Sequence, residues 1–332
     1  MRFARAVGIC LAVASAALCA PPGMPLGRAP VREVPHELKA RLASSHLDIA
    51  DSIHWVGTAE VDGIRVAIHS WIPSGACATV FLLHGYYDHS GVWEPHVRRL
   101  LARNLAVVAM DLPGHGLSEG RPMDVDSFGV YARALRAVED SLRSVAPRPW
   151  SLAGHSLGGA VALERARRPD YPYAKTLLLA PMVRYAGWAW TGAAIPVVSL
   201  FKDDLARNRK LVSSSDSSFL ARLSTDPMEG WTTSLHWLKQ VRKWHASLDG
   251  ATFAPTDWMI LQGGLDGTVD WKYGLPWLRS RLPGAKALMA PLARHHLHNE
   301  GGRTGVAVRA VFDDFLSSPP SQRPKIGLPL GG

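Results

Sequence analysis

A serine between two glycines is the first group in this chain with a type and spacing suited to chemistry. Gly154-His155-Ser156-Leu157-Gly158 fits the pattern G-x-S-x-G, in which a serine lies on a sharp turn between a strand and a helix. The apolar run Trp150–Ala153 precedes Ser156, and a helix-forming run begins at Leu157. This context predicts a nucleophilic serine at position 156, although a serine there could also be an ordinary helix N-cap.

The same five-residue pattern occurs a second time, as Gly116-Leu117-Ser118-Glu119-Gly120. Ser118 follows Gly-His-Gly and precedes Arg121-Pro122, which begins no helix. A nucleophile on a strand-to-helix turn needs both flanking elements. We therefore expect Ser118 to be structural.

A nucleophilic serine needs a base, and the base needs an orienting acid, in the chain order Ser, then Asp or Glu, then His. Asp266 follows the apolar run Trp258–Gln262 after two glycines, which predicts it to be the acid at the end of a strand. Asp270 is the alternative. Its place before Trp271 is more typical of a helix N-cap.

Three histidines follow the last predicted strand and are candidates for the base: His295, His296 and His298. The residues alone do not rank His295 above His296. Together with Glu300 they could also indicate a metal site. The sequence holds no second ligand cluster, and the serine already requires one histidine, so we expect neither a metal nor an organic cofactor.

Composition places the 332-residue chain among globular proteins, because 47% of it is hydrophobic and 20% charged. No heptad repeat appears, and no apolar run reaches the roughly 20 residues of a membrane-spanning helix. The net charge of +9 comes from scattered Lys and Arg, so nucleic-acid binding is not expected. Peripheral contact with anionic lipid remains compatible with this charge.

The N-terminus is typical of an export signal. Arg2 and Arg5 precede fifteen uncharged residues, Ala6–Ala20. We expect a cleaved signal peptide over residues 1–20 and a periplasmic or secreted protein, with an anchored form as the alternative because of Cys19. Cys77 is then the only cysteine of the mature chain, so no internal disulfide is expected.

Short apolar runs alternate with helical patterns, which predicts a mostly parallel sheet of about eight strands with helices on both faces, an α/β fold. The runs are 54–60, 64–71, 78–83, 106–110, 150–153, 176–180, 258–262 and 285–289. We expect a Pro-rich lead-in over 21–45, core over 46–182 and 253–317, a Trp-rich helical cap over 183–252, and a flexible tail over 318–332. Within the cap, Trp231 to Leu248 shows helical spacing.

Five ordered segments, spread over residues 52–316, resemble the α/β-hydrolase superfamily in its monoacylglycerol lipase and lysophospholipase branch, often labelled serine aminopeptidase-like. These are Leu83-His84-Gly85 with His89-Ser90, Asp111–Gly120, Gly154–Gly159, Gly264-Leu265-Asp266 with Val269-Asp270, and Ala293–Glu300. The resemblance implies that His295 rather than His296 is the base. It also implies that the backbone N–H groups of Tyr86 and Leu157 bind the oxyanion. His84, His89, His115 and His155 are then expected to be structural.

These residues predict acyl transfer on a small ester, most simply a monoacylglycerol-like or lysophospholipid-like substrate. Tryptophans of the cap would bind an acyl chain or would merely pack. Two alternatives stay open. A peptidase acting on an N-terminal residue would use an acidic group of the cap, for which Asp203, Asp204, Asp226 and Glu229 are available, and a non-catalytic binding protein could share the fold. Two features depart from the branch, namely the export signal and the bulky pair Tyr86-Tyr87. The sequence makes no prediction about the oligomeric state.

Overall fold

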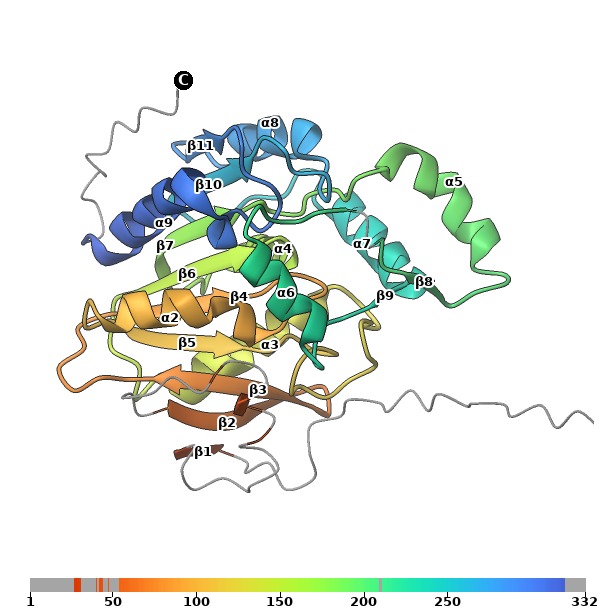
Figure 1. The fold of residues 1–332 in the computed structure, drawn as a ribbon. Helices are drawn as coiled ribbons and strands as arrows, with labels where there is room; N and C mark the ends of the chain where they lie inside the picture. Colours follow the sequence, from red (N-terminus) through yellow and green to blue (C-terminus); the bar gives the residue numbers. More distant parts are fainter. Residues whose placement is uncertain are drawn as a thin grey trace, which may run out of the picture.

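A nine-stranded sheet forms the centre of the protein in a computed structural model that describes residues 27–30, 40, 42–43, 47, 54–208 and 211–319. The predicted signal peptide, most of the lead-in and nearly all of the tail lie outside the described residues. Across the sheet the strands follow the order β1-β2-β3-β5-β4-β6-β7-β10-β11 (Figure 1). Their bounds are Gly27–Pro30 (β1), His54–Val61 (β2), Ile64–Trp71 (β3), Thr79–Leu83 (β4), Ala106–Met110 (β5), Trp150–His155 (β6), Tyr173–Leu179 (β7), Asp257–Gly263 (β10) and Lys286–Ala290 (β11).

Six neighbouring strands, from β5 to β11 in the sheet order, pair in parallel, whereas β1, β2 and β3 join them through antiparallel pairs. The predicted mostly parallel sheet is thereby confirmed, and each of the eight predicted runs forms a strand. The turn at Asp62-Gly63 joins β2 to β3 as a hairpin, with positive φ at both residues. β1 is a ninth strand inside the segment that the sequence indicated as a lead-in.

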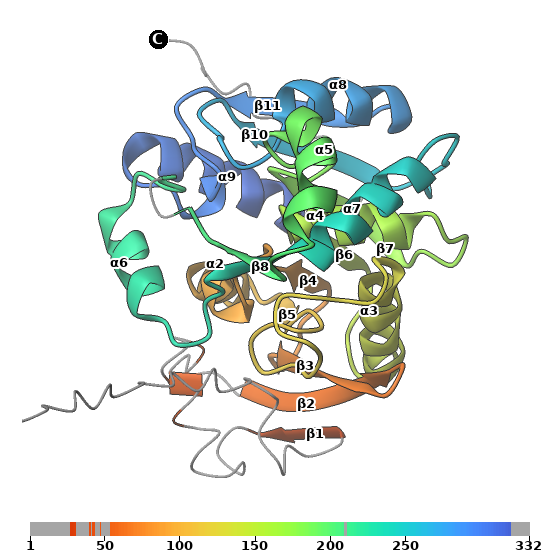
Figure 2. The ribbon, with the colours of Figure 1, turned by 90° about the vertical axis from the view of Figure 1, so that its right-hand side faces the viewer.

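Helices cover both faces of the sheet (Figure 2). Because side chains alternate along a strand, β5 sends Val108 and Met110 into one core and Val107 and Ala109 into the other. The first core includes residues of α3 (Gly129–Leu142), α4 (Leu157–Ala166) and α8 (Trp271–Arg281), and the second those of α2 (Glu94–Leu101) and α9 (Gly302–Ser317). Two short 3-10 helices, η2 (Ser90–Trp93) and η3 (Leu297–Asn299), complete these layers.

Residues 180–256, between β7 and β10, form an inserted segment outside the central sheet. It lies at the carboxyl ends of the parallel strands (Figure 1, Figure 2). Its elements are α5 (Trp188–Val198), β8 (Asp204–Ala206), α6 (Ser217–Thr225), β9 (Thr232–Ser234) and α7 (Leu235–Ser247). The predicted helical stripe becomes α7, which begins at Leu235 rather than Trp231 because residues 232–234 pair with β8. None of the helices in the described part of the chain is long and apolar enough to cross a membrane.

A buried ion pair fixes α4, the helix that follows Ser156, to α3. Arg165 Nη2 lies 2.8 Å from Glu139 Oε2, and both side chains are 3% exposed. Burial raises the pKa of the Glu139 carboxyl, while Arg165 opposes that shift. Because a buried charge without its partner is costly, this pair controls how firmly α4 is held.

We predict that Arg165→Met lowers the free energy of unfolding by about 3–5 kcal/mol, because Glu139 would lose its buried counter-charge. Urea unfolding followed by circular dichroism measures the loss. Replacing both partners, as Arg165→Met with Glu139→Leu, should recover much of it. Equal midpoints for the wild type and the single variant would contradict this role of the pair.

Candidate active site

Ser156 lies on a strained turn between β6 and α4, as its G-x-S-x-G context predicts. Its backbone has φ 51° and ψ −109°, a conformation that residues with a side chain rarely adopt. The surrounding structure holds this turn from two sides. The Ser156 amide donates to Leu179 O at 2.9 Å, and the Met182 amide donates to Ser156 O at 3.1 Å.

The two glycines of the motif are required by close backbone contacts. A Cβ on Gly154 would lie 2.4 Å from Gly158 O, and one on Gly158 would lie 2.3 Å from Leu83 O. The Gly158 amide also donates to His84 O at 3.0 Å. The start of α4 therefore packs directly against the end of β4, with no room for a side chain between them.

Asp266 and His295 form a direct hydrogen bond, with His295 Nδ1 2.9 Å from Asp266 Oδ2. Asp266 follows β10 and His295 lies in the loop after β11, so two neighbouring parallel strands bring them together at the same edge of the sheet. Both residues are buried. Of the two adjacent histidines that the residues alone did not separate, it is His295 that contacts this carboxylate.

The Asp266 carboxylate is held by four hydrogen bonds. Oδ1 accepts from the amides of Thr268 and Val269 at 2.8 and 3.2 Å, and Oδ2 accepts from Gln262 Nε2 at 3.1 Å in addition to His295. Burial opposes ionisation, but His295 and these donors outweigh it and lower the pKa of the Asp266 carboxyl. The carboxylate is thus charged and fixed in orientation beside the imidazole.

Leu157, the first residue of α4, directly precedes Gly158, and Tyr86 lies two residues after His84, so the hydrogen bond between Gly158 and His84 brings their two segments together. Within the described part of the chain, neither amide donates a backbone hydrogen bond. The Tyr86 ring stacks on Trp237 of α7 at 3.7 Å between centroids. Its hydroxyl donates to Met123 O at 2.5 Å and accepts from the Ser234 amide at 3.1 Å.

The alternatives to Ser156 and Asp266 have other contacts. Ser118 is buried, and its hydroxyl donates to Asp111 O at 2.6 Å and accepts from the Ala67 amide at 2.8 Å. Asp270 is the N-cap of α8, where its side chain accepts from the Tyr273 amide. Both residues therefore take the structural positions that their sequence contexts indicated.

The other histidines near the site are held by hydrogen bonds, by an ion pair or by ring stacking. His84 Nδ1 lies 2.7 Å from Gly85 O, and His115 Nδ1 lies 2.9 Å from Pro113 O. His89 pairs with Asp226 of the inserted segment at 2.8 Å; burial opposes its protonation, but Asp226 raises its pKa to about 9. His298 is buried with its ring stacked on Trp93.

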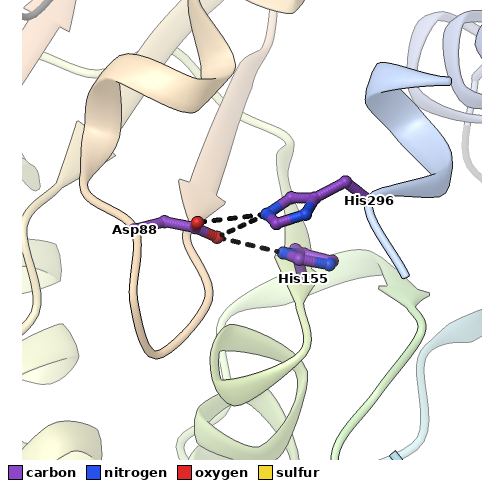
Figure 3. A group of neighbouring side chains, drawn as sticks. All are labelled: Asp88, His155 and His296. Carbon is purple, nitrogen blue, oxygen red and sulfur yellow. Dashed lines mark hydrogen bonds and ion pairs between the residues drawn. The ribbon is translucent and has the colours of Figure 1, made fainter. Parts of the chain in front are cut away.

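The metal alternative from His295, His296, His298 and Glu300 does not match the contacts observed, because Glu300 accepts from the amides of Arg294 and Ser215. A different group, Asp88, His155 and His296, has its potential ligand atoms within 4.8 Å of one another (Figure 3). Asp88 already accepts hydrogen bonds there, from His296 Nε2 at 3.0 Å and from the Gly85 amide at 3.2 Å. The expectation of no metal stays a prediction.

Ser156 and His295 line one cavity of about 360 Å³ together with the inserted segment. The inserted segment contributes the apolar walls, namely Met182, Trp190, Leu205, Leu211, Trp237 and Leu238. Arg207 and Thr233 add polar groups, and the Tyr87 hydroxyl lies 2.6 Å from Thr233 Oγ1. The arrangement places a serine, a histidine and its carboxylate partner beside a mainly apolar space.

Sequence reasoning missed three residues of this region. Gln262 contacts Asp266, Asp88 contacts two histidines, and Arg207 lines the cavity while pairing with Glu229. Gln262 carried a signal, because it is a polar residue at the end of an otherwise apolar strand run. Asp88 lies inside the segment between His84 and His89, whereas nothing in the sequence marks Arg207.

The fold is that of an α/β hydrolase. A soluble variant of monoglyceride lipase from Saccharomyces cerevisiae, solved with a substrate analogue, superposes with a TM-score of 0.66 at 18% identity over 80% of this chain and 97% of that one. The predicted α/β-hydrolase fold is confirmed.

The model of one family, serine aminopeptidase S33, matches residues 74–301. The chain belongs to this family. It is 37% identical to human monoglyceride lipase over 153 residues, which cover 45% of this chain and 49% of that protein. It is 33% identical to the pimeloyl-[acyl-carrier protein] methyl ester esterase of Nitrosomonas europaea over 130 residues, 38% of this chain and 47% of that one. The chain thus aligns with about half the length of the curated relatives it matches, and the resemblance to monoacylglycerol lipases is confirmed.

We predict that Asp266→Asn lowers kcat for an ester about 10⁴-fold, because an amide cannot stabilise the protonated imidazole and favours the wrong tautomer. The matched control is Asp270→Asn, which should cost at most about 1 kcal/mol of stability through its helix cap and leave kcat unchanged. Steady-state kinetics on p-nitrophenyl butyrate separate the two. A large loss in Asp270→Asn with a normal Asp266→Asn would reverse the assignment.

Proposed function

We propose that this protein is a serine carboxylic-ester hydrolase that cleaves monoacylglycerol-like or lysophospholipid-like esters through an acyl-enzyme. The hydrogen bond between His295 Nδ1 and Asp266 Oδ2 carries the proposal, because it orients an imidazole in the cavity that also exposes Ser156. No group other than these side chains and the backbone is needed for the reaction.

The proposed reaction has two halves. Since Asp266 occupies Nδ1 of His295, Nε2 is the nitrogen that takes the proton from Ser156 Oγ as this oxygen attacks the ester carbonyl. The tetrahedral intermediate collapses to an acyl-serine, and His295 returns the proton to the leaving alcohol. Water, deprotonated by the same imidazole, then attacks the acyl carbon. The bond between Ser156 Oγ and the acyl group breaks, the imidazolium returns its proton to Oγ, and the acid leaves. The amides of Tyr86 and Leu157 would bind the oxyanion, Leu157 at the electropositive start of α4.

An acyl chain fits the apolar walls of the cavity better than a polar substrate does. Trp190, Trp237 and Leu238 offer large faces without buried unpaired polar groups. Two of the relatives described above, a monoglyceride lipase and a methyl ester esterase, support an ester as the substrate. We therefore propose that residues 183–252 act as a cap that binds the acyl chain.

The acidic residues that a peptidase would use to hold a free amine are engaged or exposed. Asp226 is bound to His89, and Glu229 is bound to Arg207. Asp203 and Asp204 are exposed, and neither lines the cavity with Ser156. These contacts favour the ester over an N-terminal amino acid.

We predict that Ser156→Ala abolishes hydrolysis of p-nitrophenyl esters without unfolding the protein, because the attacking oxygen is removed. Ser118→Ala is the control and should retain turnover. A panel of monoacylglycerols, lysophospholipids, p-nitrophenyl esters and aminoacyl-anilides on the same preparation identifies the substrate class. Turnover that persists in Ser156→Ala would refute a serine mechanism, and an inactive wild type would favour a binding protein.

We further propose that the protein contacts a lipid surface through α5 and the residues after it. In Figure 1 this helix projects away from the body of the protein. The residues just after α5 carry large apolar side chains in solvent, with Leu200 77% and Phe201 81% exposed. Trp190 is 68% exposed and also lines the cavity, so the apolar surface adjoins the cavity mouth. A lipid-derived substrate would enter from that side.

We predict that Leu200→Ser with Phe201→Ser weakens binding to phosphatidylglycerol vesicles by about tenfold or more, because apolar area is lost from the contact. Co-sedimentation measures the binding. Activity on soluble p-nitrophenyl butyrate should stay unchanged, and Val145→Ser, at an exposed apolar residue just after α3, should alter neither. Equal vesicle binding by all proteins would exclude this surface.

A further inference from the structure

One buried carboxylate, that of Asp88, lies between the three segments that carry the reacting groups. Figure 3 shows the side chains of Asp88, His155 and His296 converging from the loop after β4, the end of β6 and the loop after β11. All three side chains are at most 3% exposed. Burying polar side chains this deeply costs free energy unless they are hydrogen-bonded to one another or to the backbone.

The residues that contact Asp88 are direct sequence neighbours of residues in the proposed mechanism. Asp88 accepts from the Gly85 amide at 3.2 Å, and Gly85 directly precedes Tyr86. His296 Nε2 lies 3.0 and 3.1 Å from the two Asp88 oxygens, and His296 directly follows His295.

His155 closes the arrangement from the side of the nucleophile. It directly precedes Ser156, and its Nδ1 lies 3.4 Å from Asp88 Oδ2. Its Nε2 lies 3.1 Å from His295 O. The loop of the oxyanion amide, the serine turn and the base loop thus meet at one carboxylate.

The charge of Asp88 is held by imidazoles and one amide. Burial opposes ionisation, but His296 and His155 outweigh it and lower the pKa of the Asp88 carboxyl well below its usual range. Within the described part of the chain, no lysine or arginine pairs with Asp88. Close packing leaves little freedom, because a Cβ on Gly85 would lie 2.5 Å from Asp88 Oδ2.

We propose that Asp88 is a positioning residue for acyl transfer, and that it acts through His155, His296 and the Gly85 amide. It sets the separation of the Tyr86 amide, Ser156 and His295 without touching the substrate's reacting atoms. The proposal rests on the proposed function. The same residue types could instead hold a divalent metal. Hydrogen bonds already satisfy both Asp88 oxygens, which argues against a metal there, and the experiment below tests for one.

The test compares Asp88→Asn with Asp313→Asn in the full-length protein. Asp313 is also a buried aspartate, but it pairs with Arg99 and Arg103 between α9 and α2, away from the cavity. Asp88→Asn keeps the shape of the side chain. It replaces one carboxylate oxygen, an acceptor, by an NH2 group, which would face the Gly85 amide and the imidazole N–H groups that donate to Asp88. We expect kcat for p-nitrophenyl butyrate to fall about 100-fold with little change in KM, since misplacement of reacting groups by about 1 Å has that effect. The rate at which a fluorophosphonate labels Ser156 should fall in parallel, and Asp313→Asn should leave both rates unchanged.

His296→Gln breaks the cluster from the other side and serves if Asp88→Asn does not fold, as circular dichroism will show. If the residues act as a unit, the double variant loses no more kcat than either single variant. Unchanged kcat in a folded Asp88→Asn, a loss confined to KM, or activity that EDTA removes and zinc restores would each overturn the proposal. A wild type inert to both ester and probe would contradict the proposed function instead.

Discussion

The strained backbone of Ser156 is the constraint on which the rest of the site depends. A positive φ at a residue with a side chain costs roughly 1–3 kcal/mol and persists only where the surroundings enforce it. Here the enforcement comes from the sheet itself, because β4 and β7 hold the turn through Leu83, His84 and Leu179. The strand order that places β6 between β4 and β7 is therefore part of the chemistry.

From this turn outward, the parallel sheet delivers every other reacting group to the same edge. β4, β6, β10 and β11 all end there, and the loops that follow them carry Tyr86, Ser156, Asp266 and His295. Parallel pairing alone brings the strand ends to one edge but does not set distances between side chains on different loops. Those distances depend on polar contacts such as the four hydrogen bonds to Asp266.

The sheet and the order of the candidate groups were predictable, since buried strands appear as short apolar runs and a strand-to-helix serine has its own local pattern. Ser156 differs from Ser118 in its flanking elements, and that local information was sufficient to place Ser156, and not Ser118, on a strand-to-helix turn. The choice between His295 and His296 required a resemblance, because adjacent histidines differ in the direction of their side chains and not in their context. Asp88 meets His296 only across a long sequence separation, so no local pattern reports it. Gln262 contacts Asp266 four residues further on, and its polar side chain at the end of an apolar run was the available signal. β1 was missed because its pairing with β2 is a tertiary contact in a Pro-rich stretch.

Tyr86 and Tyr87, which looked merely bulky in the sequence, are fastened to the inserted segment. Tyr86 stacks on Trp237 and accepts from the Ser234 amide, while Tyr87 O accepts from the Gly230 amide at 2.6 Å. The backbone that presents the Tyr86 amide therefore cannot shift independently of residues 230–237. Chimeras that exchange this segment with that of a relative, in order to change chain-length preference, would have to transplant both tyrosines with it, or the graft would alter the loop it was meant to leave alone.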